Sequence, residues 1–125
     1  MKVLIVDDSL LDRKLLVRIF MKAGVAQEII QAEDGEQGLE LLATNYKDIC
    51  LMLLDWQMPK MSGIELMAGV MKVPELEHIP IIMVTASGSD ENKQTAYKIN
   101  PKLAGYVVKP YKPEELIAAV KPYLR

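Results

Sequence analysis

The sequence has few of the features that mark secreted or membrane-bound proteins. Its single cysteine, Cys50, lies in an apolar segment without a partner, so it is interpreted as a small core residue and not as part of a disulfide framework. No apolar run approaches the length that spans a membrane. The opening MKVLIV is too short for the apolar region of a secretory signal and is followed by two aspartates, so we expect a cytoplasmic location.

The sequence also lacks an excess of charge of one sign. Its 15 basic and 17 acidic residues give a formal net charge of −2, which provides no general attraction to nucleic acid or to a membrane surface. No glycine-rich loop follows the apolar segment at residues 3–6, which argues against a nucleotide-binding protein of flavodoxin or Rossmann type. The 125 residues, half of them apolar, are therefore expected to form a single free-standing domain, residues 1–125.

Five short apolar segments are interpreted as strands: Val3–Val6, Gln27–Ala32, Ile49–Leu54, Ile81–Thr85 and Gly105–Val108. Four of them are nearly continuous in Val, Ile, Leu or Met, which is typical of strands buried on both faces. Because segments of helical periodicity separate them, we expect a parallel sheet with right-handed crossovers and helices on both faces. The predicted fold is an α/β three-layer sandwich of five strands and five helices.

Short polar patterns mark the helix starts. Ser9 precedes Asp12, and Ser62 precedes Glu65, at the spacing of a capping box, in which each of the two side chains binds the backbone N–H of the other residue. One face of the helix that follows Ser9 is predicted to be an apolar stripe made of Leu11, Leu15, Leu16, Ile19, Phe20 and Ala23.

Polar residues fall at the carboxyl ends of four predicted strands. Asp7 and Asp8 end the first strand, Asp55 the third, Thr85 the fourth and Lys109 the fifth. The carboxyl ends of parallel strands line one crevice, and ligands bind there. With the strand order 2-1-3-4-5, the first and third strands are neighbours. We therefore expect the three aspartates to converge.

Three carboxylates in one crevice repel one another, and at least one takes up a proton unless a cation is present. Mg²⁺ is the expected cation because it prefers oxygen ligands and is commonly shared between a few carboxylates and a phosphate; Mn²⁺ is the alternative. Mg²⁺ and Lys109 would balance the three carboxylates and leave a neutral site for a phosphoryl group. Asp55, alone at its strand end, is the predicted nucleophile, and Thr85 and Lys109 are predicted to hold the transferred oxygens.

Four segments resemble the response-regulator receiver domains of two-component signalling. They are VLIVDDS at 3–9, LMLLDWQMPKMSGIEL at 51–66, PIIMVTAS at 80–87 and GYVVKPY at 105–111. The resemblance runs from the first strand to the last helix and is closest to the single-domain chemotaxis-type regulators. It implies a flavodoxin-like receiver fold. Because the strand order 2-1-3-4-5 is already known for that family, the predicted order is not independent of the resemblance.

The resemblance implies a role for each matching position at the acidic site. Asp55 is implied as the phospho-acceptor, and Lys109 as the lysine that contacts the phosphoryl group. Asp8 is implied as a direct metal ligand and Asp7 as one that acts largely through water. The remaining protein ligand is implied to be the backbone carbonyl of Gln57.

Other matching positions concern switching and the lifetime of the phosphoryl group. Thr85 matches the switch hydroxyl, and Tyr106 matches the aromatic residue whose rotamer follows it. Ala86 leaves the path of the phosphate open, and Ser87 lies where family members vary and tune autodephosphorylation. The Lys109–Pro110 peptide bond is implied to be cis.

The implied function is that of a phosphorylation switch. A sensor histidine kinase or histidine phosphotransfer protein would donate the phosphoryl group. The face made by the fourth helix, fifth strand and fifth helix would then change and signal to a downstream protein. The domain would catalyse only its own phosphorylation and dephosphorylation, so it is not expected to be an enzyme. No direct contact with nucleic acid or membrane is expected, and the chain would be a monomer or a weak phosphorylation-dependent dimer.

Two alternatives come from other functional classes. A phosphatase of the haloacid-dehalogenase type also uses Asp, Thr and Lys at strand ends. Its nucleophile, however, lies on the first strand with a second aspartate two positions on, whereas Asp7 and Asp8 are adjacent. An interaction module that is never phosphorylated is the second alternative, and the complete acidic set argues against it.

Overall fold

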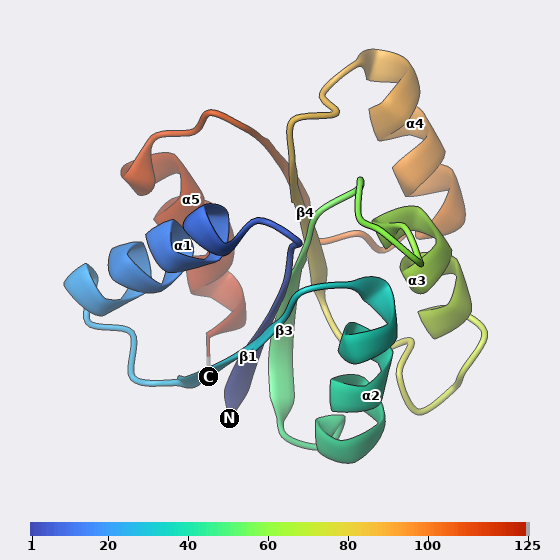
Figure 1. Ribbon diagram of the computed structural model, residues 1–125, viewed down its shortest axis with the longest axis horizontal. Coiled ribbons are helices and arrows are strands. Elements are labelled where there is room, and N and C mark those ends of the chain that lie inside the picture. The colour runs from blue at the N-terminus through green and yellow to red at the C-terminus, as the bar shows by residue number, and fades with distance from the viewer. Residues whose placement is uncertain (125) are drawn as a thin grey trace.

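The computed structural model describes residues 1–124, in which strands and helices alternate (Figure 1). The strands are β1 (Lys2–Val6), β2 (Glu28–Ala32), β3 (Ile49–Leu54), β4 (Ile81–Thr85) and β5 (Gly105–Val108). The helices are α1 (Leu10–Lys22), α2 (Gly35–Asn45), α3 (Gly63–Val70), α4 (Asp90–Ile99) and α5 (Pro113–Val120), with a short 3₁₀ turn, η1 (Lys121–Tyr123), after α5. The strand predictions are confirmed to within one residue at the starts of β1 and β2.

The five strands form one parallel sheet in the order β2-β1-β3-β4-β5, as predicted. The register brings the strand ends of the acidic site together. Val6 at the end of β1 pairs with Leu54 at the end of β3, so the aspartates that follow these residues are neighbours. Thr85 pairs with Val108, and the backbone N–H of Lys109 continues the ladder by donating to the Thr85 carbonyl at 2.9 Å.

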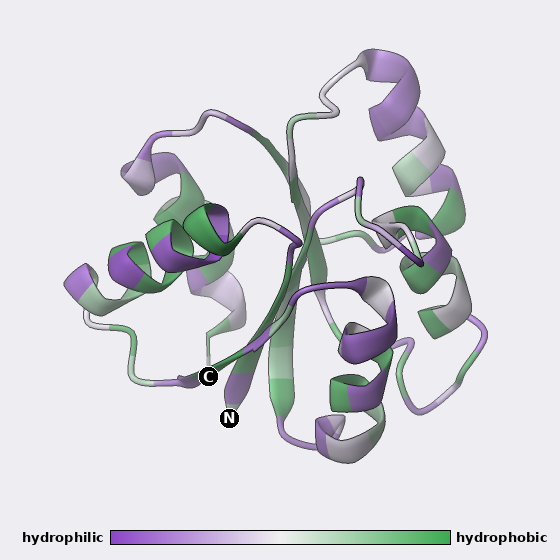
Figure 2. Cartoon of the chain, viewed as in Figure 1, coloured by the Kyte–Doolittle hydropathy of each residue, from purple (hydrophilic) through white to green (hydrophobic). Residues whose placement is uncertain are grey.

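Helices cover both faces of the sheet, and each face has its own core. Helices α2, α3 and α4 pack on one face, and α1 and α5 lie together on the other (Figure 1). Successive strand residues alternate between the two cores, so Leu4 and Val6 enter one and Val3 and Ile5 the other. This explains the continuous apolar strands, seen as the green centre of Figure 2. Within residues 1–124, no helix is both long and apolar enough to cross a bilayer.

The predicted apolar stripe of α1 is partly wrong. Leu16, Ile19 and Phe20 are buried against the sheet, but Leu11 is 80% exposed and Leu15 46% exposed. Ala23, also predicted to be part of the stripe, is exposed, and buried Arg13 occupies the inner face in the first turn of α1 instead. A charged residue fills this position because its guanidinium has specific backbone and side-chain partners.

Candidate functional site

Three aspartates meet at the carboxyl edge of the sheet. A carboxylate oxygen from each of Asp7, Asp8 and Asp55 lies within 4.8 Å of the other two. Asp7 is buried, Asp55 is half-buried and Asp8 is exposed. The cluster therefore runs from the protein interior to the solvent.

The inner and outer members of this cluster have different partners. Asp7 Oδ1 accepts a hydrogen bond from Ser9 N at 2.9 Å, and its Oδ2 accepts one from Lys109 Nζ at 2.8 Å. Burial raises the pKa of Asp7 in spite of these two bonds. Asp8 accepts no hydrogen bond from the part of the chain that the structure describes, so its oxygens face solvent without a protein partner.

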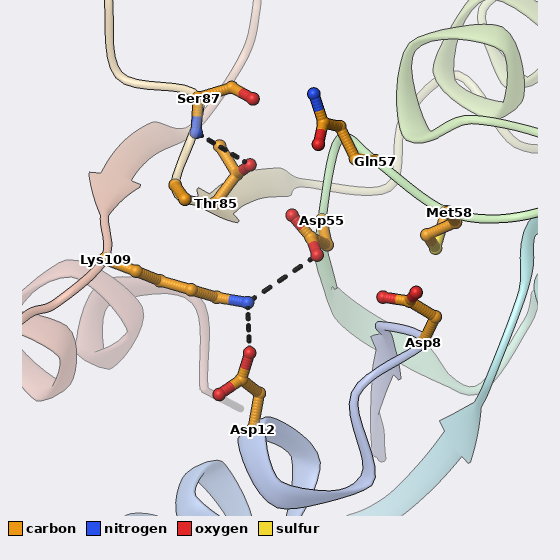
Figure 3. A pocket seen from close by; sticks show the side chains of 9 residues that line it. Asp8, Asp12, Asp55, Gln57, Met58, Thr85, Ser87 and Lys109 are labelled. Atoms are coloured by element: carbon orange, nitrogen blue, oxygen red, sulfur yellow. Dashed lines mark hydrogen bonds and ion pairs between the residues drawn. The ribbon is translucent and has the colours of Figure 1, made fainter.

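Lys109 reaches across the site from the end of β5. Its Nζ lies 2.8 Å from Asp7 Oδ2. It also lies 2.7 Å from Asp12 Oδ2 and 3.6 Å from Asp55 Oδ2 (Figure 3). Burial alone would lower the pKa of Lys109, but the hydrogen bonds to Asp12 and Asp7 and the charge of Asp55 outweigh it and raise the pKa. Lys109 is therefore held as an ammonium ion.

Asp12 is the site residue that sequence reasoning missed. Its carboxylate makes the shortest of the three contacts with Lys109. The neutral charge balance predicted from three carboxylates is therefore incomplete, because a fourth carboxylate shares the lysine. No local signal distinguishes it: Asp12 lies in the first turn of α1, where it is expected to cap the helix, and its partner Lys109 is 97 residues away.

The predicted capping box at the start of α1 is only half formed for the same reason. Ser9 Oγ accepts a hydrogen bond from Asp12 N at 3.2 Å, as predicted. The Asp12 carboxylate, however, turns to Lys109, and the Ser9 N–H donates to Asp7 instead. The helix start is thus built into the acidic site.

Four further predicted residues, Gln57, Thr85, Ala86 and Ser87, line an open cavity of about 500 Å³ above Asp55. Its lining is made of Asp8, Asp12, Asp55, Gln57, Met58, Thr85, Ala86, Ser87 and Lys109. Thr85 is buried, and its Oγ1 accepts a hydrogen bond from Ser87 N at 3.2 Å (Figure 3). Ala86 and Gln57 are exposed. The cavity is therefore wide enough for a phosphoryl group and open on the side of Ala86.

The backbone around Asp55 is closely packed. Asp55 Oδ1 accepts a hydrogen bond from Trp56 N at 2.7 Å. Gly63 N donates to the Trp56 carbonyl at 2.8 Å, and a Cβ at position 63 would lie 1.9 Å from the Asp55 carbonyl oxygen. Only glycine lets the start of α3 approach this closely, so Gly63 is a structural support of the site.

Tyr106 lies outside the cavity lining but is linked to the same loop. Its hydroxyl donates a hydrogen bond to the Ser87 carbonyl, and Lys93 Nζ lies 5.9 Å from the centre of its ring. Burial, followed by the charge of Asp55, raises the pKa of Tyr106. The Lys109–Pro110 peptide bond is cis, the geometry that the resemblance implied.

The fold and site together define a doubly wound α/β domain with acidic side chains and a lysine at its switch point. Residues 3–121 match the family described as the response regulator receiver domain. The chain therefore belongs to the receiver-domain family of two-component response regulators, as its motifs indicated.

Relatives and solved structures agree with this assignment. The chain is 36% identical over 116 residues to a chemotaxis protein CheY homolog of Campylobacter jejuni, covering 93% of this chain and 86% of that protein. A chain in the CheX–CheY–BeF3–Mg²⁺ complex from Borrelia burgdorferi aligns with a TM-score of 0.87 and 29% identity, covering 98% of this chain and 87% of that one. The Mn²⁺-bound response regulator Rcp1 aligns with a TM-score of 0.79 and 25% identity, covering 97% and 89%.

Proposed function

We propose that this receiver domain accepts a phosphoryl group on Asp55 in a Mg²⁺-dependent reaction and passes the signal to a protein partner. The donor is a phosphohistidine on a sensor histidine kinase or a histidine phosphotransfer protein. The observation that carries the proposal is the gathering of Asp7, Asp8 and Asp55 within 4.8 Å, with the Lys109 ammonium 3.6 Å from Asp55. Such a set of charges suits a metal-assisted aspartyl phosphate.

The donor atoms around Asp55 fit a small divalent cation. They are all oxygens, and the free carboxylate of Asp8 leaves one side of the cluster open to water and phosphate. Asp8, Asp55 and the backbone carbonyl of Gln57 would hold Mg²⁺ or Mn²⁺, and Asp7, whose oxygens are already engaged, would act largely through water. The bound ion supplies positive charge for the phosphoryl oxygens. The Mg²⁺ and Mn²⁺ in the two similar structures support this choice.

Asp55 acts as the nucleophile in the proposed reaction. One of its carboxylate oxygens forms a bond to phosphorus while the bond from phosphorus to the donor imidazole nitrogen breaks, and the electron pair returns to the imidazole. The Trp56 N–H fixes the orientation of the carboxylate, and Lys109 and the Thr85 hydroxyl bind the transferred oxygens. Water later hydrolyses the acyl phosphate. The domain thus acts only on its own phosphorylation state.

The signal leaves through the face made by α4, β5 and α5. Thr85 and Tyr106 both bind the backbone of Ser87, Thr85 at its N–H and Tyr106 at its carbonyl. When the Thr85 hydroxyl turns to a phosphoryl oxygen, it releases the Ser87 N–H, and the β4–α4 loop and Tyr106 can rearrange together. A downstream protein reads the changed face. The Borrelia complex, in which CheY is paired with CheX, supports a protein partner.

Incubation with acetyl phosphate, with and without Mg²⁺, followed by intact mass measurement, tests the proposal. We expect one phosphoryl adduct that requires Mg²⁺ and is absent from Asp55→Asn. An adduct that persists in Asp55→Asn would refute the assignment. Turnover of a generic phosphate ester that survives Asp55→Asn but is abolished by Asp7→Asn would instead favour the haloacid-dehalogenase alternative.

A further inference from the structure

The Lys109 ammonium is engaged mainly on the α1 side of the cavity. Of its three N–H donors, one binds Asp7 Oδ2 at 2.8 Å and one binds Asp12 Oδ2 at 2.7 Å. Asp55 Oδ2, at 3.6 Å, lies beyond hydrogen-bond distance. In Figure 3 dashed lines join the lysine nitrogen to both Asp12 and Asp55, and the contact with Asp12 is the shorter one.

The backbones of both residues are fixed, but Lys109 has a much longer and more flexible side chain than Asp12. The backbone N–H of Asp12 is capped by Ser9 Oγ at 3.2 Å. The next residue, buried Arg13, donates to the Asp7 carbonyl at 2.7 Å and to Gln31 Oε1 at 3.1 Å, which ties the first turn of α1 to β1 and β2. The flexible four-carbon stem of Lys109 is therefore the part that moves when a phosphoryl group enters.

We propose that Asp12 is a positioning residue whose carboxylate retains Lys109 on the α1 side of the cavity and so slows phosphoryl transfer to Asp55. This inference rests on the proposed function. The third N–H of Lys109 is free, but Asp55 Oδ2 lies beyond its reach at 3.6 Å. Lys109 must therefore move toward Asp55 to bind the incoming phosphoryl oxygens, and this movement breaks its bond to Asp12. The cost of breaking that charge-assisted bond is added to the barrier of the transfer. Asp12 thus acts on the phosphorylation rate through Lys109 without touching the phosphoryl group.

The test compares phosphorylation rates with acetyl phosphate and Mg²⁺, in which phosphorus passes from acetate to Asp55 and acetate leaves with the electron pair. Asp12→Asn, which keeps the shape of the side chain, should react about fivefold faster than the wild type, given that Asp12 is partly exposed. Asp12→Glu, which restores the carboxylate, should return the rate toward that of the wild type. The matched control is Glu114→Gln in the first turn of α5, which removes an equal charge and should leave the rate unchanged; Glu114 has no ion pair within residues 1–124.

A second comparison separates positioning from simple charge repulsion. In a Lys109→Ala background, Asp12→Asn should change the rate by less than about twofold, because there is no lysine to release. If Lys109→Ala reacts too slowly to follow, the same cycle is measured in the affinity for beryllium fluoride with Mg²⁺, using Trp56 fluorescence. An equal acceleration in both backgrounds would overturn the proposal in favour of charge repulsion.

The failure of this inference can be told apart from failure of the proposed function. If the wild type forms no adduct, the proposed function fails. If the wild type is phosphorylated on Asp55 but Asp12→Asn reacts at the same rate, the role of Asp12 alone is refuted.

Discussion

Helices α1 and α3 begin with the same local pattern, a serine followed three residues later by an acidic residue, yet their first turns differ. At α3 the capping box is complete: Ser62 Oγ accepts from Glu65 N at 3.2 Å, and Glu65 Oε1 accepts from Ser62 N at 3.1 Å. At α1 only the serine half is present. The acidic side chain there binds Lys109, 97 residues away in the sequence.

The difference between α1 and α3 shows when a local sequence pattern is sufficient to form a capping box. Among residues 1–124, no long-range partner competes for Glu65, which is exposed on the outer surface of α3, so the box closes by itself. The start of α1 lies at the carboxyl edge of the sheet, where the neighbouring strand brings Asp7 and the fifth strand brings Lys109. There Lys109 engages the Asp12 carboxylate, Asp7 accepts the hydrogen bond from Ser9 N in its place, and the helix start becomes part of the site.

Among the variants that distinguish the two helix starts, Lys109→Ala should have the largest effect on stability. It removes the long-range partner of Asp12 at the start of α1 and leaves the start of α3 unchanged. Buried Asp7 would lose a charge-assisted bond in the middle of a carboxylate cluster. We expect the metal-free protein to lose about 2–3 kcal/mol of unfolding free energy, somewhat less than for a fully buried pair. Urea denaturation with EDTA measures the loss, and saturating Mg²⁺ should reduce it. A loss that is unchanged by Mg²⁺ would contradict the charge-balance explanation.

Asp7→Asn should have the opposite effect and stabilise the metal-free protein. It removes one charge from the cluster, so the metal-free protein should gain about 1 kcal/mol. Burial raises the pKa of Asp7, so the folded protein binds this proton more tightly than the unfolded chain does. Stability is therefore lost as the pH rises from the ordinary pKa of an aspartate through the raised value. Thermal melts across that pH range should show a shallower decline in Asp7→Asn, whereas exposed Asp48→Asn should follow the wild type.

Ser62→Ala should break the complete box and cost about 1 kcal/mol, the usual cost of losing an N-cap. Ser9→Ala should cost a similar amount through the bond to Asp12 N, but it should also loosen the acidic site. Mg²⁺ titration followed by Trp56 fluorescence separates the two: Ser62→Ala should leave the midpoint unchanged. An equal shift of the midpoint in both variants would contradict the conclusion that the start of α1 belongs to the acidic site and the start of α3 does not.

Asp12→Asn should have the smallest effect on stability, below about 0.5 kcal/mol, because its carboxylate is partly exposed and Lys109 keeps Asp7 as a partner. Glu65→Gln should be similarly mild, since the amide oxygen can still accept from Ser62 N. The two variants should differ in function and not in stability, with only Asp12→Asn altering the phosphorylation rate. Chemical denaturation alongside the rate measurement checks this.

The sheet could be predicted because its strands are continuous apolar segments bounded by polar residues, and the order of strands came from the family resemblance. The convergence of Asp7, Asp8 and Asp55 then followed from that order. The inner face of α1 was harder to predict. Arg13 is buried there because it has backbone and side-chain partners, whereas the more apolar Leu11 and Leu15 are exposed. Asp12 was assigned to a capping box, and only tertiary structure reveals that its carboxylate has a stronger partner.

Identification of the modified residue tests the central claim most directly. After reaction with acetyl phosphate and Mg²⁺, borohydride reduction converts an aspartyl phosphate into homoserine, which peptide mass spectrometry locates in the sequence. We expect homoserine in place of Asp55 alone, and none when Mg²⁺ is replaced by EDTA. Homoserine at Asp7, Asp8 or Asp12, or the same yield without metal, would contradict it.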